Sequence, residues 1–224
     1  NKVSELIFFF LYSQICLYPN IVNQFLLTNL LFLMNLYKKY HISIGSNIGD
    51  RLINIQSSID LIHSRIACFT TISSVYNSKS IGFEGDDFYN ICASFTTIID
   101  PHDVMQQLLE IEKILGRNRI NEGKYISRKI DIDILLIEDL IINSEELKVP
   151  HVEMCNRKFV LDPLIEIDPN LIHPLKKMSL KEIYNSFDQN QKIKKTTLSL
   201  NNPSNILSIG QYNYCLLYTS DAAD

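Results

Sequence analysis

The apolar residues between Tyr40 and Ile137 switch repeatedly between two spacings, and this succession constrains the fold more than any other feature. A two-residue period is typical of strands, and a spacing of three or four residues is typical of helices. The resulting order is strand, helix, two strands, helix and strand, followed by a mixed C-terminal region. It predicts an α+β fold, a ferredoxin-like split βαβ sandwich with helices packed on a mostly antiparallel sheet.

Residues that start and stop elements support this order. Gly45 ends the first strand, and Asp50 is placed to cap the helix that follows. Asp100 and Pro101 start the second helix, and Gly116 ends it. The predicted strands span 40–44, 70–76, 88–99 and 130–137, and the predicted helix faces carry Leu52, Ile55, Ile59 and Ile62, then Val104, Leu108, Ile111 and Leu115.

The two ends of the chain differ in composition from its middle. Residues 1–33 are apolar with only two charged side chains, and we expect them to be non-native upstream translation or a leader. A membrane anchor or a targeting segment is the alternative. The expected location is the cytoplasm, or an organelle if residues 1–33 are a genuine targeting leader. The expected remaining parts are one domain over 38–187, a linker or tail over 188–214, and a sequencing-adaptor scar over 215–224.

Charge and cysteine content exclude several classes of protein. The chain has 21 Lys and Arg against 25 Asp and Glu, a net charge of −4, which argues against a general nucleic-acid binder. Its five cysteines are scattered and odd in number, so neither a disulfide scaffold nor a structural zinc site is expected. A reducing compartment is favoured. No membrane partner is expected for the domain. The apolar runs 6–18 and 25–36 that precede it are each too short to span a bilayer.

Asp131 and Asp133 are separated by one residue on the last predicted strand. Alternate side chains of a strand share a face, so the two carboxylates project side by side, about 7 Å apart along the strand. Two carboxylates on one rigid face suit hard divalent cations, and Mg²⁺ completes its shell with water and substrate phosphate. The alternative is a pair of solvated aspartates on the outer face of an edge strand.

A basic loop leads directly into this strand. Guanidinium groups bind phosphate oxygens bidentately, so positive charge beside a carboxylate pair predicts a site for a polyphosphate and a metal. A solvated basic loop is the alternative. The thirteen residues from 117 to 129 carry a local charge of +4, from Arg117, Arg119, Lys124, Arg128 and Lys129 against Glu122.

Five further side chains could belong to the same site. His151 follows a proline-fixed bend, and Arg157 and Phe159 come shortly after it. Phe88 and Asn90 share one face of a predicted strand, where an aromatic ring and a carboxamide could stack on and hydrogen-bond a planar heterocycle. Taken singly, each has a structural explanation: a satisfied histidine, a surface charge, a core aromatic residue or an ordinary strand residue.

Taken in order, these residues form a specific series. The series is Gly45-Ser46-Asn47, Phe88-Tyr89-Asn90, Glu112-xxx-Gly116-Arg117, Arg128-xx-Asp131-Ile-Asp133, Val149-Pro150-His151 and Arg157-x-Phe159-xxx-Pro163-Leu164. It resembles the 6-hydroxymethyl-7,8-dihydropterin pyrophosphokinase family of folate biosynthesis over residues 40–174. The resemblance implies the same ferredoxin-like fold. It also implies a Mg²⁺-dependent transfer of pyrophosphate from the co-substrate ATP to the pterin hydroxymethyl group, with release of AMP.

The resemblance further implies a role for each matching residue. Asp131 and Asp133 would hold two Mg²⁺ ions and, with Arg117, Arg119 and Arg128, would form the catalytic set. The residues implied at ATP are Glu112, Arg117, Arg128, Ile134, His151 and Arg157. The residues implied at the pterin are Ser78, Ile81, Gly82, Phe88, Asn90 and Phe159.

Three alternatives stay open. The chain could be the first module of a protein fused to dihydropteroate synthase. It could be a catalytically impaired homologue that only binds a pterin or a nucleotide. It could also be another Mg²⁺-dependent transferase, although such an enzyme would lack the paired aromatic platform. The basic loop departs from the family pattern, since Tyr125 replaces a common tryptophan and Ile120 a lysine.

Overall fold

A computed structural model describes residues 36–80, 82–117, 127–186 and 191–203. The chain forms two compact units, of which one spans Lys39–Ile209. The other consists of Asn1–Lys38 and Gly210–Asp224, and only residues 36–38 of it are described. The expectations for 1–33 and 215–224 therefore lie outside the described residues. Within the described ranges, the helices are too short or too polar to cross a membrane.

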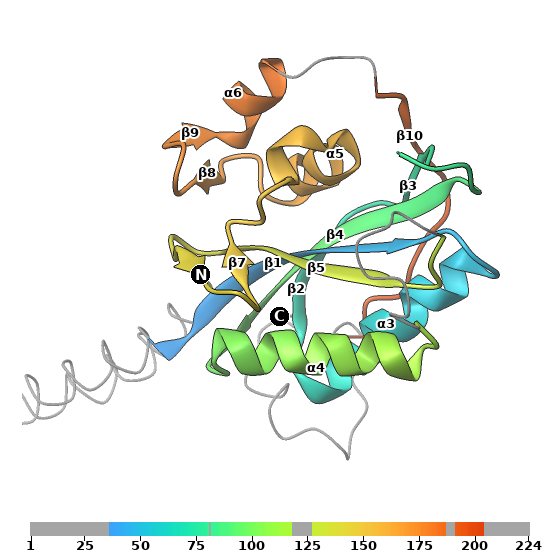
Figure 1. The fold of residues 1–224 in the computed structure, drawn as a ribbon, viewed down its shortest axis with the longest axis horizontal. Coiled ribbons are helices and arrows are strands. Elements are labelled where there is room, and N and C mark those ends of the chain that lie inside the picture. Colours follow the sequence, from blue (N-terminus) through green and yellow to red (C-terminus); the bar gives the residue numbers. More distant parts are fainter. Residues whose placement is uncertain (1–35, 81, 118–126, 187–190, 204–224) are drawn as a thin grey trace, which may run out of the picture. The chain divides into compact units, whose positions relative to one another are not determined.

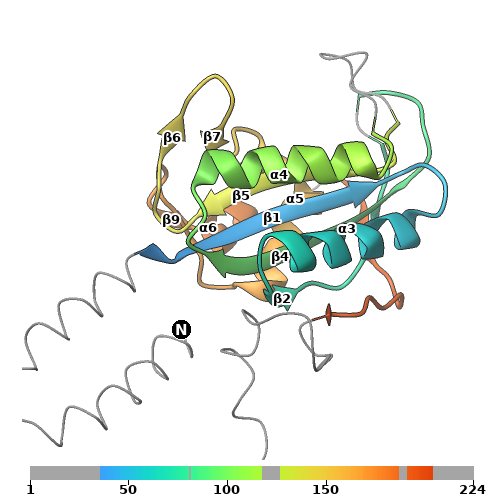
Figure 2. The ribbon, with the colours of Figure 1, turned by 90° about the horizontal axis from the view of Figure 1, so that it is seen from below.

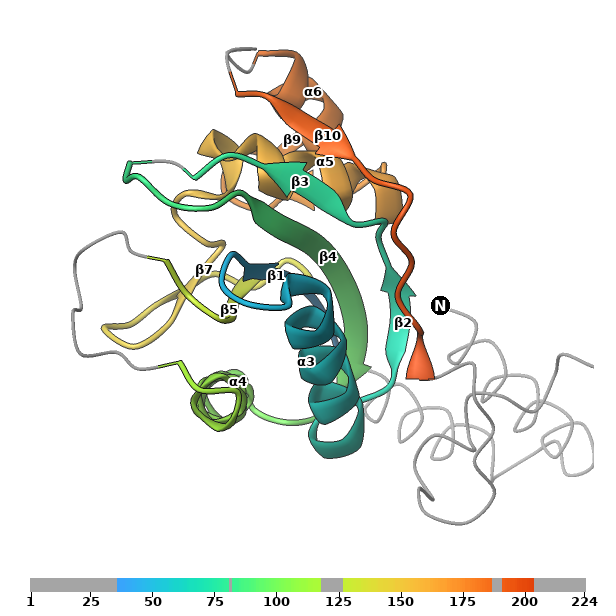
Figure 3. The ribbon, with the colours of Figure 1, turned by 90° about the vertical axis from the view of Figure 1, so that its right-hand side faces the viewer.

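A six-stranded sheet forms the centre of the unit that spans Lys39–Ile209. The order across the sheet is β10 (Ile193–Lys195), β3 (Tyr76–Ser78), β4 (Phe88–Thr97), β1 (Lys38–Ser46) and β5 (Asp131–Ile137), and β2 (Phe69–Ile72) also pairs with β4. The pairs β1–β5, β2–β4, β3–β4 and β3–β10 are antiparallel. Figure 3 shows β10 lying along β3 at one edge of this sheet.

Two helices, α3 (Arg51–Arg65) and α4 (Pro101–Ile114), cover one face of the sheet (Figure 2). Each starts at a capping aspartate, which satisfies a backbone donor of the first turn. Asp50 accepts a hydrogen bond from the Ile53 N–H at 3.0 Å, and Asp100 accepts one from the His102 N–H at 2.9 Å. The main core lies between these helices and the sheet, and it includes Ile42, Ile55, Ile59, Ile91, Phe95, Leu108, Ile111 and Ile132.

The opposite face is covered by α5 (Lys158–Ile167) and α6 (Leu180–Asn185), as Figure 1 shows. A second core lies there and combines Cys92 and Leu136 of the sheet with Leu161, Leu164 and Ile183. The connecting elements are the hairpins β6 (Ile142–Asn143) with β7 (Lys148–Val149) and β8 (Ile172–His173) with β9 (Met178–Ser179), and a 3₁₀ turn at Met154–Asn156. Helices and an antiparallel sheet occupy separate layers, so the fold is α+β, as the sequence predicts.

Two parts of the chain differ from their predicted form. The range 70–76, predicted as one β-rich segment, contains the end of β2 and the start of β3 with residues 73–75 between them. The range 188–214, expected as a linker or tail, contributes β10 to the sheet, where Ile193 pairs with Ser78. The Thr196 N–H then donates to Val75 O at 2.9 Å. Part of this range is therefore built into the domain.

Candidate functional site

Asp131 and Asp133 lie on the same face of β5, as the alternation predicts. Ile132 and Ile134 point to the other face, where they are at most 3% exposed in the main core. In the register of the sheet, Asp131 is opposite Gly45 and Asp133 is opposite Ser43 of β1. The two carboxylates therefore project from the face that α3 and α4 leave uncovered.

Two arginines, one from each end of the basic loop, hold the Asp131 carboxylate. Arg117 follows the C-terminus of α4, and its Nη1 lies 2.5 Å from Asp131 Oδ1. Arg128 precedes β5, and its Nη1 lies 2.7 Å from Asp131 Oδ2. Arg119, in the range 118–126, lies outside the described residues. The described ends of the loop thus bring two guanidinium groups to the carboxylate pair.

Glu112, a buried residue of α4, holds Arg117 in place. Its side chain is 1% exposed near the end of α4 and forms an ion pair with Arg117. Its Oε1 also accepts a hydrogen bond from the Ile132 N–H at 2.7 Å. A buried carboxylate is tolerated when it is paired and hydrogen-bonded in this way. Ile132 lies between Asp131 and Asp133 on β5. Glu112 therefore fixes both Arg117 and the strand that carries the two aspartates.

The surroundings of Asp133 suit a divalent cation. Arg157 Nη1 lies 3.8 Å from Asp133 Oδ2, and 33% of the Asp133 side chain is exposed, enough for a cation to reach it. The surrounding protein still desolvates the carboxyl, and this effect together with the charge of Asp131 raises the pKa of Asp133 to about 7. Arg157 opposes the shift without cancelling it. A cation beside the two carboxylates would relieve this uncompensated negative charge.

The donor set also limits how such a cation could be held. The described residues include no group of three or more His, Cys, Asp and Glu side chains arranged to bind a metal. Two carboxylates alone fill only part of the shell of Mg²⁺, which takes its remaining ligands from water and substrate phosphate. The donor chemistry of Asp131 and Asp133 fits Mg²⁺ that is bound together with a polyphosphate.

His151 lies beside the same group of charges as a neutral side chain. Its backbone N–H donates to Leu135 O at 2.9 Å, which ties it to β5. Its Nδ1 accepts a hydrogen bond from the Glu153 N–H at 3.2 Å, so the neutral ring carries its proton on Nε2. Burial, followed by the charge of Arg157, lowers the pKa of His151. The Nε2–H group can then donate to an anionic oxygen.

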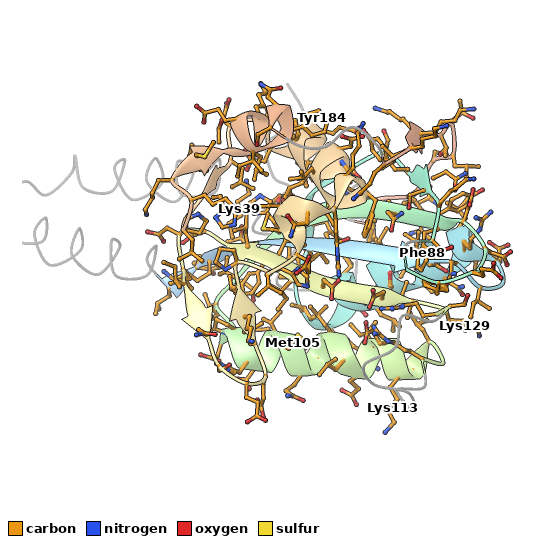
Figure 4. All side chains as sticks on the ribbon, turned by 45° about the horizontal axis from the view of Figure 1, so that its top comes forward. Lys39, Phe88, Met105, Lys113, Lys129 and Tyr184 are labelled. Atoms are coloured by element: carbon orange, nitrogen blue, oxygen red, sulfur yellow. The ribbon has the colours of Figure 1, made fainter. Side chains whose placement is uncertain are left out.

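Phe88 and Asn90 share the face of the carboxylates but lie on β4, on the other side of β1. Asn90 is 2% exposed, and its Nδ2 donates to Ser78 Oγ at 2.9 Å. A Cβ placed on Gly45 of β1 would lie 3.0 Å from Asn90 Oδ1 and 3.6 Å from the Phe88 ring. Gly45 therefore leaves room beside these side chains. Figure 4 shows Phe88 at the same end of the sheet as Lys129, opposite the end that carries Lys39.

The remaining predicted site residues are Phe159, Gly82, Ile81 and Ile134. Phe159 lies in the first turn of α5, partly buried against the second core, with the Arg157 guanidinium 5.8 Å from its ring centre. Gly82 has a φ of 84°, a conformation that favours glycine. Ile81 lies outside the described residues. Ile134 faces the main core, on the side of β5 away from the aspartates, and its contact with adenine stays a prediction.

One residue whose contacts the sequence did not reveal is Asn47, in the turn after β1. Only the motif Gly45-Ser46-Asn47 contained a signal for it, and that motif predicts a tight loop without naming its partners. The side chain is 1% exposed and bonds to two segments that are distant in the sequence.

The chain is similar to a family of known proteins. The sequence profile of 7,8-dihydro-6-hydroxymethylpterin-pyrophosphokinase (HPPK) matches residues 41–169. The chain is 38% identical over 143 residues to a 2-amino-4-hydroxy-6-hydroxymethyldihydropteridine pyrophosphokinase of Aquifex aeolicus, covering 63% of this chain and 88% of that protein. It is 38% identical over 129 residues to the protein of the same name from Bacillus subtilis, covering 57% of this chain and 76% of that protein.

Longer relatives and solved structures match over a part of their length. The folic acid synthesis protein FOL1 of Dictyostelium discoideum is 37% identical over 60% of this chain, which spans 20% of that protein. A crystal structure of Plasmodium falciparum HPPK-DHPS with pteroate matches with a TM-score of 0.56 at 15% identity, over 67% of this chain and 42% of the other. The second match supports a shared fold.

Proposed function

The chain belongs to the 7,8-dihydro-6-hydroxymethylpterin-pyrophosphokinase family, and we propose that it transfers pyrophosphate from ATP to 6-hydroxymethyl-7,8-dihydropterin. The products would be AMP and the pterin diphosphate used in folate biosynthesis. The observation that carries this proposal is the pair Asp131 and Asp133 on one face of β5, with guanidinium groups of three arginines beside them. A carboxylate pair beside clustered guanidinium groups is what a metal-bound triphosphate requires.

The phosphate side of the site would bind ATP through side chains from several segments of the chain. Arg117 and Arg128 would release part of their pairing with Asp131 to contact phosphate oxygens, and Glu112 would keep Arg117 in place. Arg157 and the Nε2–H of His151 would bind further oxygens from the α5 side. Asp131 and Asp133 would hold two Mg²⁺ ions, which neutralise charge on the phosphates when bound.

The pterin side would be formed by β4, β3 and the start of α5. Phe88 and Phe159 would stack on the pterin ring, while Asn90, fixed by Ser78, would hydrogen-bond its edge. Gly82 and Ile81 would lie along the same pocket. These assignments follow the family pattern, and the shared face of Phe88, Asn90 and the aspartates supports them.

The distance between the two sides agrees with this reaction. β1 separates β4 from β5, and neighbouring strands are about 4.8 Å apart, so the two sides lie about 10 Å apart across the sheet. A bound pterin could then present its hydroxymethyl oxygen to the β-phosphorus above β1, where Gly45 leaves space. Transfer of this kind depends chiefly on alignment and charge neutralisation, so no strong protein base is needed.

We further propose that the sheet has the ferredoxin-like split βαβ arrangement. Two β-α-β units, β1-α3-β3 and β4-α4-β5, interleave in the strand order β3-β4-β1-β5, and this order supports the proposal. β2 and β10 would then be additions to the common pattern.

The decisive experiment is incubation of the protein with ATP, Mg²⁺ and the hydroxymethyl pterin, followed by nucleotide analysis. We expect AMP and the pterin diphosphate, with no turnover when Mg²⁺ is chelated. ADP instead of AMP would indicate transfer of a single phosphoryl group and would contradict the proposal. Binding of both substrates without any product would favour the catalytically impaired homologue.

A second possibility concerns the protein around this domain. The chain spans 20% and 19% of the folic acid synthesis proteins of Dictyostelium discoideum and Pneumocystis carinii, and under half of the solved HPPK-DHPS chains. This observation favours a fusion to dihydropteroate synthase as the alternative setting. Sequencing the native transcript past residue 224 would test it, and a stop codon directly after the domain would exclude it.

A further inference from the structure

Asn47 occupies a buried junction in the turn between β1 and α3. Its side chain is 1% exposed. Its Nδ2 donates to Asp86 O at 3.2 Å and to Ser127 Oγ at 3.1 Å, and its Oδ1 accepts from the Arg128 N–H at 2.7 Å. Its own backbone N–H donates to Arg128 O at 3.2 Å. One buried residue therefore joins two segments that are far apart in the sequence.

The chemistry of these partners fixes the orientation of the amide. The Asp86 carbonyl can only accept a hydrogen bond, and the Arg128 N–H can only donate one. A flipped amide would set oxygen against oxygen and a donor against a donor. Replacing Asn47 by a residue without these groups would remove two part-buried hydrogen bonds, those with the Arg128 N–H and the Asp86 carbonyl, at a cost in free energy.

The two joined segments lead into opposite sides of the site. Asp86 precedes Phe88 and Asn90 on β4, the pterin side. Arg128 precedes β5 and holds Asp131, the phosphate side. The segments also approach each other closely, since a Cβ placed on Gly85 would lie 2.7 Å from Ser127 Oγ. Asn47 lies at this contact and fixes its geometry through bonds to both segments.

A second contact from the same turn strengthens the pterin side of the junction. Arg51, the first residue of α3, donates from Nη1 to Asp87 O at 2.7 Å. Its guanidinium also lies 3.8 Å from the centre of the Tyr89 ring. The residues on either side of Phe88 are thus held by the turn that carries Asn47, so a shift of this turn would move Phe88 as well.

We propose that Asn47 is a positioning residue that sets the separation of the pterin side and the phosphate side of the site. This inference rests on the proposed function, because a separation matters only if two substrates react across it. Asn47 acts through Asp86 and Arg128. Transfer between two bound molecules is sensitive to alignment, and a misplacement of about 1 Å can lower the rate about a hundredfold.

The test compares turnover with the binding of each substrate alone. Asn47→Ala removes all three side-chain bonds, whereas Asn47→Asp keeps an acceptor for the Arg128 N–H and loses both donations. We expect kcat to fall about tenfold to a hundredfold in both variants. The Kd of a non-hydrolysable ATP analogue and the Kd of the pterin, each measured alone, should change by less than about threefold, since each side stays intact.

Asn54→Ala is the matched control. Asn54 lies in the first turn of α3, and its Nδ2 donates to Ser46 Oγ at 3.2 Å and to Ile48 O at 2.8 Å. It therefore supports the same turn without contacting Asp86, Ser127 or Arg128. We expect a similar loss of thermal stability but a kcat within about twofold of the unsubstituted protein. If Asn47→Ala does not fold, Ser127→Ala removes one bond from the other side and should give a smaller fall in kcat.

Two outcomes would overturn the inference. One is an equal fall of kcat in the Asn47 and Asn54 variants. The other is a loss of activity in the Asn47 variants that follows weaker binding of the separate substrates. Hydrogen exchange gives a readout that does not depend on activity: Asn47→Ala should speed exchange at residues 85–88 and at Arg128, and Asn54→Ala should not. If the unsubstituted protein forms no AMP, the proposed function fails, and unchanged exchange would independently overturn the role of Asn47.

Discussion

Asp131 and Asp133 lie two residues apart on one strand, yet their surroundings predict opposite effects of neutralising them. Asp131 is held by Arg117 and Arg128, so Asp131→Asn should lower the unfolding free energy by about 2 kcal/mol. Asp133 carries charge that the protein compensates incompletely, so Asp133→Asn should unfold at the same or a higher temperature without Mg²⁺. Thermal unfolding in metal-free buffer measures both effects.

Addition of Mg²⁺ extends the same comparison. We expect Mg²⁺ with an ATP analogue to raise the unfolding temperature of the unsubstituted protein and to do so much less in either variant. Neither variant should turn over substrate. An undiminished rise in Asp133→Asn would contradict the assignment of this carboxylate to the metal.

Glu112 offers a second test at the scale of single residues. Glu112→Ala should lower the unfolding free energy by about 3 kcal/mol, because the Ile132 N–H and Arg117 both lose a buried partner. Glu112→Gln retains an acceptor for the N–H and loses only the charge, so its cost should be about half as large. Urea denaturation of the two variants measures the difference. Equal losses would show that the hydrogen bond to Ile132 contributes nothing.

Whether the placement of a residue can be predicted depends on how far away its partners lie in the sequence. The shared face of Asp131 and Asp133 could be predicted because alternation along a strand is local. The same rule places the side chain of Ile134 in the core, which was also predictable from the sequence. The partners of Asn47 could not be predicted, since Asp86 and Arg128 meet it only after the sheet has formed.

At the scale of elements, β10 is the strand that the polar composition of residues 188–214 did not predict. Its three residues pair with β3, the strand that carries Ser78, and Lys195 forms an ion pair with Glu166 of α5. Gln191 also accepts a hydrogen bond from the Lys158 N–H at 3.0 Å, next to Arg157 and Phe159. This polar segment gave no strand signal, because an edge strand with exposed lysines needs little apolar surface.

Removal of β10 should therefore weaken the pterin side. Truncation after residue 190 should lower the unfolding free energy by about 2 kcal/mol, from the loss of a few backbone hydrogen bonds, and should weaken pterin binding more than ATP-analogue binding. Truncation after residue 203 is the control and should leave both affinities unchanged. The first truncation would refute this view of β10 if it left pterin affinity and stability intact.

Helices α3 and α4 were predictable for a different reason. Each combines an aspartate cap with an apolar stripe along the helix, and both signals arise from residues close together in the sequence. The short strands β6–β9 lack such signals, because segments of two residues show too few periods to be recognised. The six-residue helix α6 has a capping box of Ser179 and Glu182 but is also too short to show a clear apolar stripe. Packing fixes their positions instead: Ile142 and Val149 of the β6–β7 hairpin contact the main core, and Ile183 of α6 belongs to the second core.

At the scale of the whole domain, the site draws on the sheet and on the helical layers of both its faces, with Glu112 coming from α4. The aspartates, Phe88 and Asn90 come from the sheet, whereas Arg157 and Phe159 come with α5 from the layer above it. The attachment of α5 to the sheet therefore sets the geometry of the site. At the end of α5 this attachment is electrostatic, since Asp168 Oδ2 lies 2.8 Å from Lys39 Nζ and 3.2 Å from the Nε2 of buried His41 on β1.

This attachment should make stability depend on pH. The His41 hydrogen bond, with Lys39, holds the pKa of Asp168 well below its usual range, and burial lowers the pKa of His41. Both groups bind fewer protons in the folded than in the unfolded chain. The unfolding free energy should therefore fall as the pH drops through about 6.5, the ordinary pKa of histidine, and again below about 4, that of aspartate.

Asp168→Asn separates this contribution from others that titrate in the same range, such as Asp133, whose raised pKa acts in the opposite direction. At pH 7 the variant should be less stable by about 1–2 kcal/mol, because the neutral amide loses the charge pairing. The gap should persist to about pH 4 and then close as Asp168 of the unsubstituted protein takes up a proton. Urea denaturation at pH 7, 5 and 3 measures it, with Asp103→Asn on the exposed side of α4 as control. A gap of constant size down to pH 3 would show that the carboxylate charge does not attach α5 to β1.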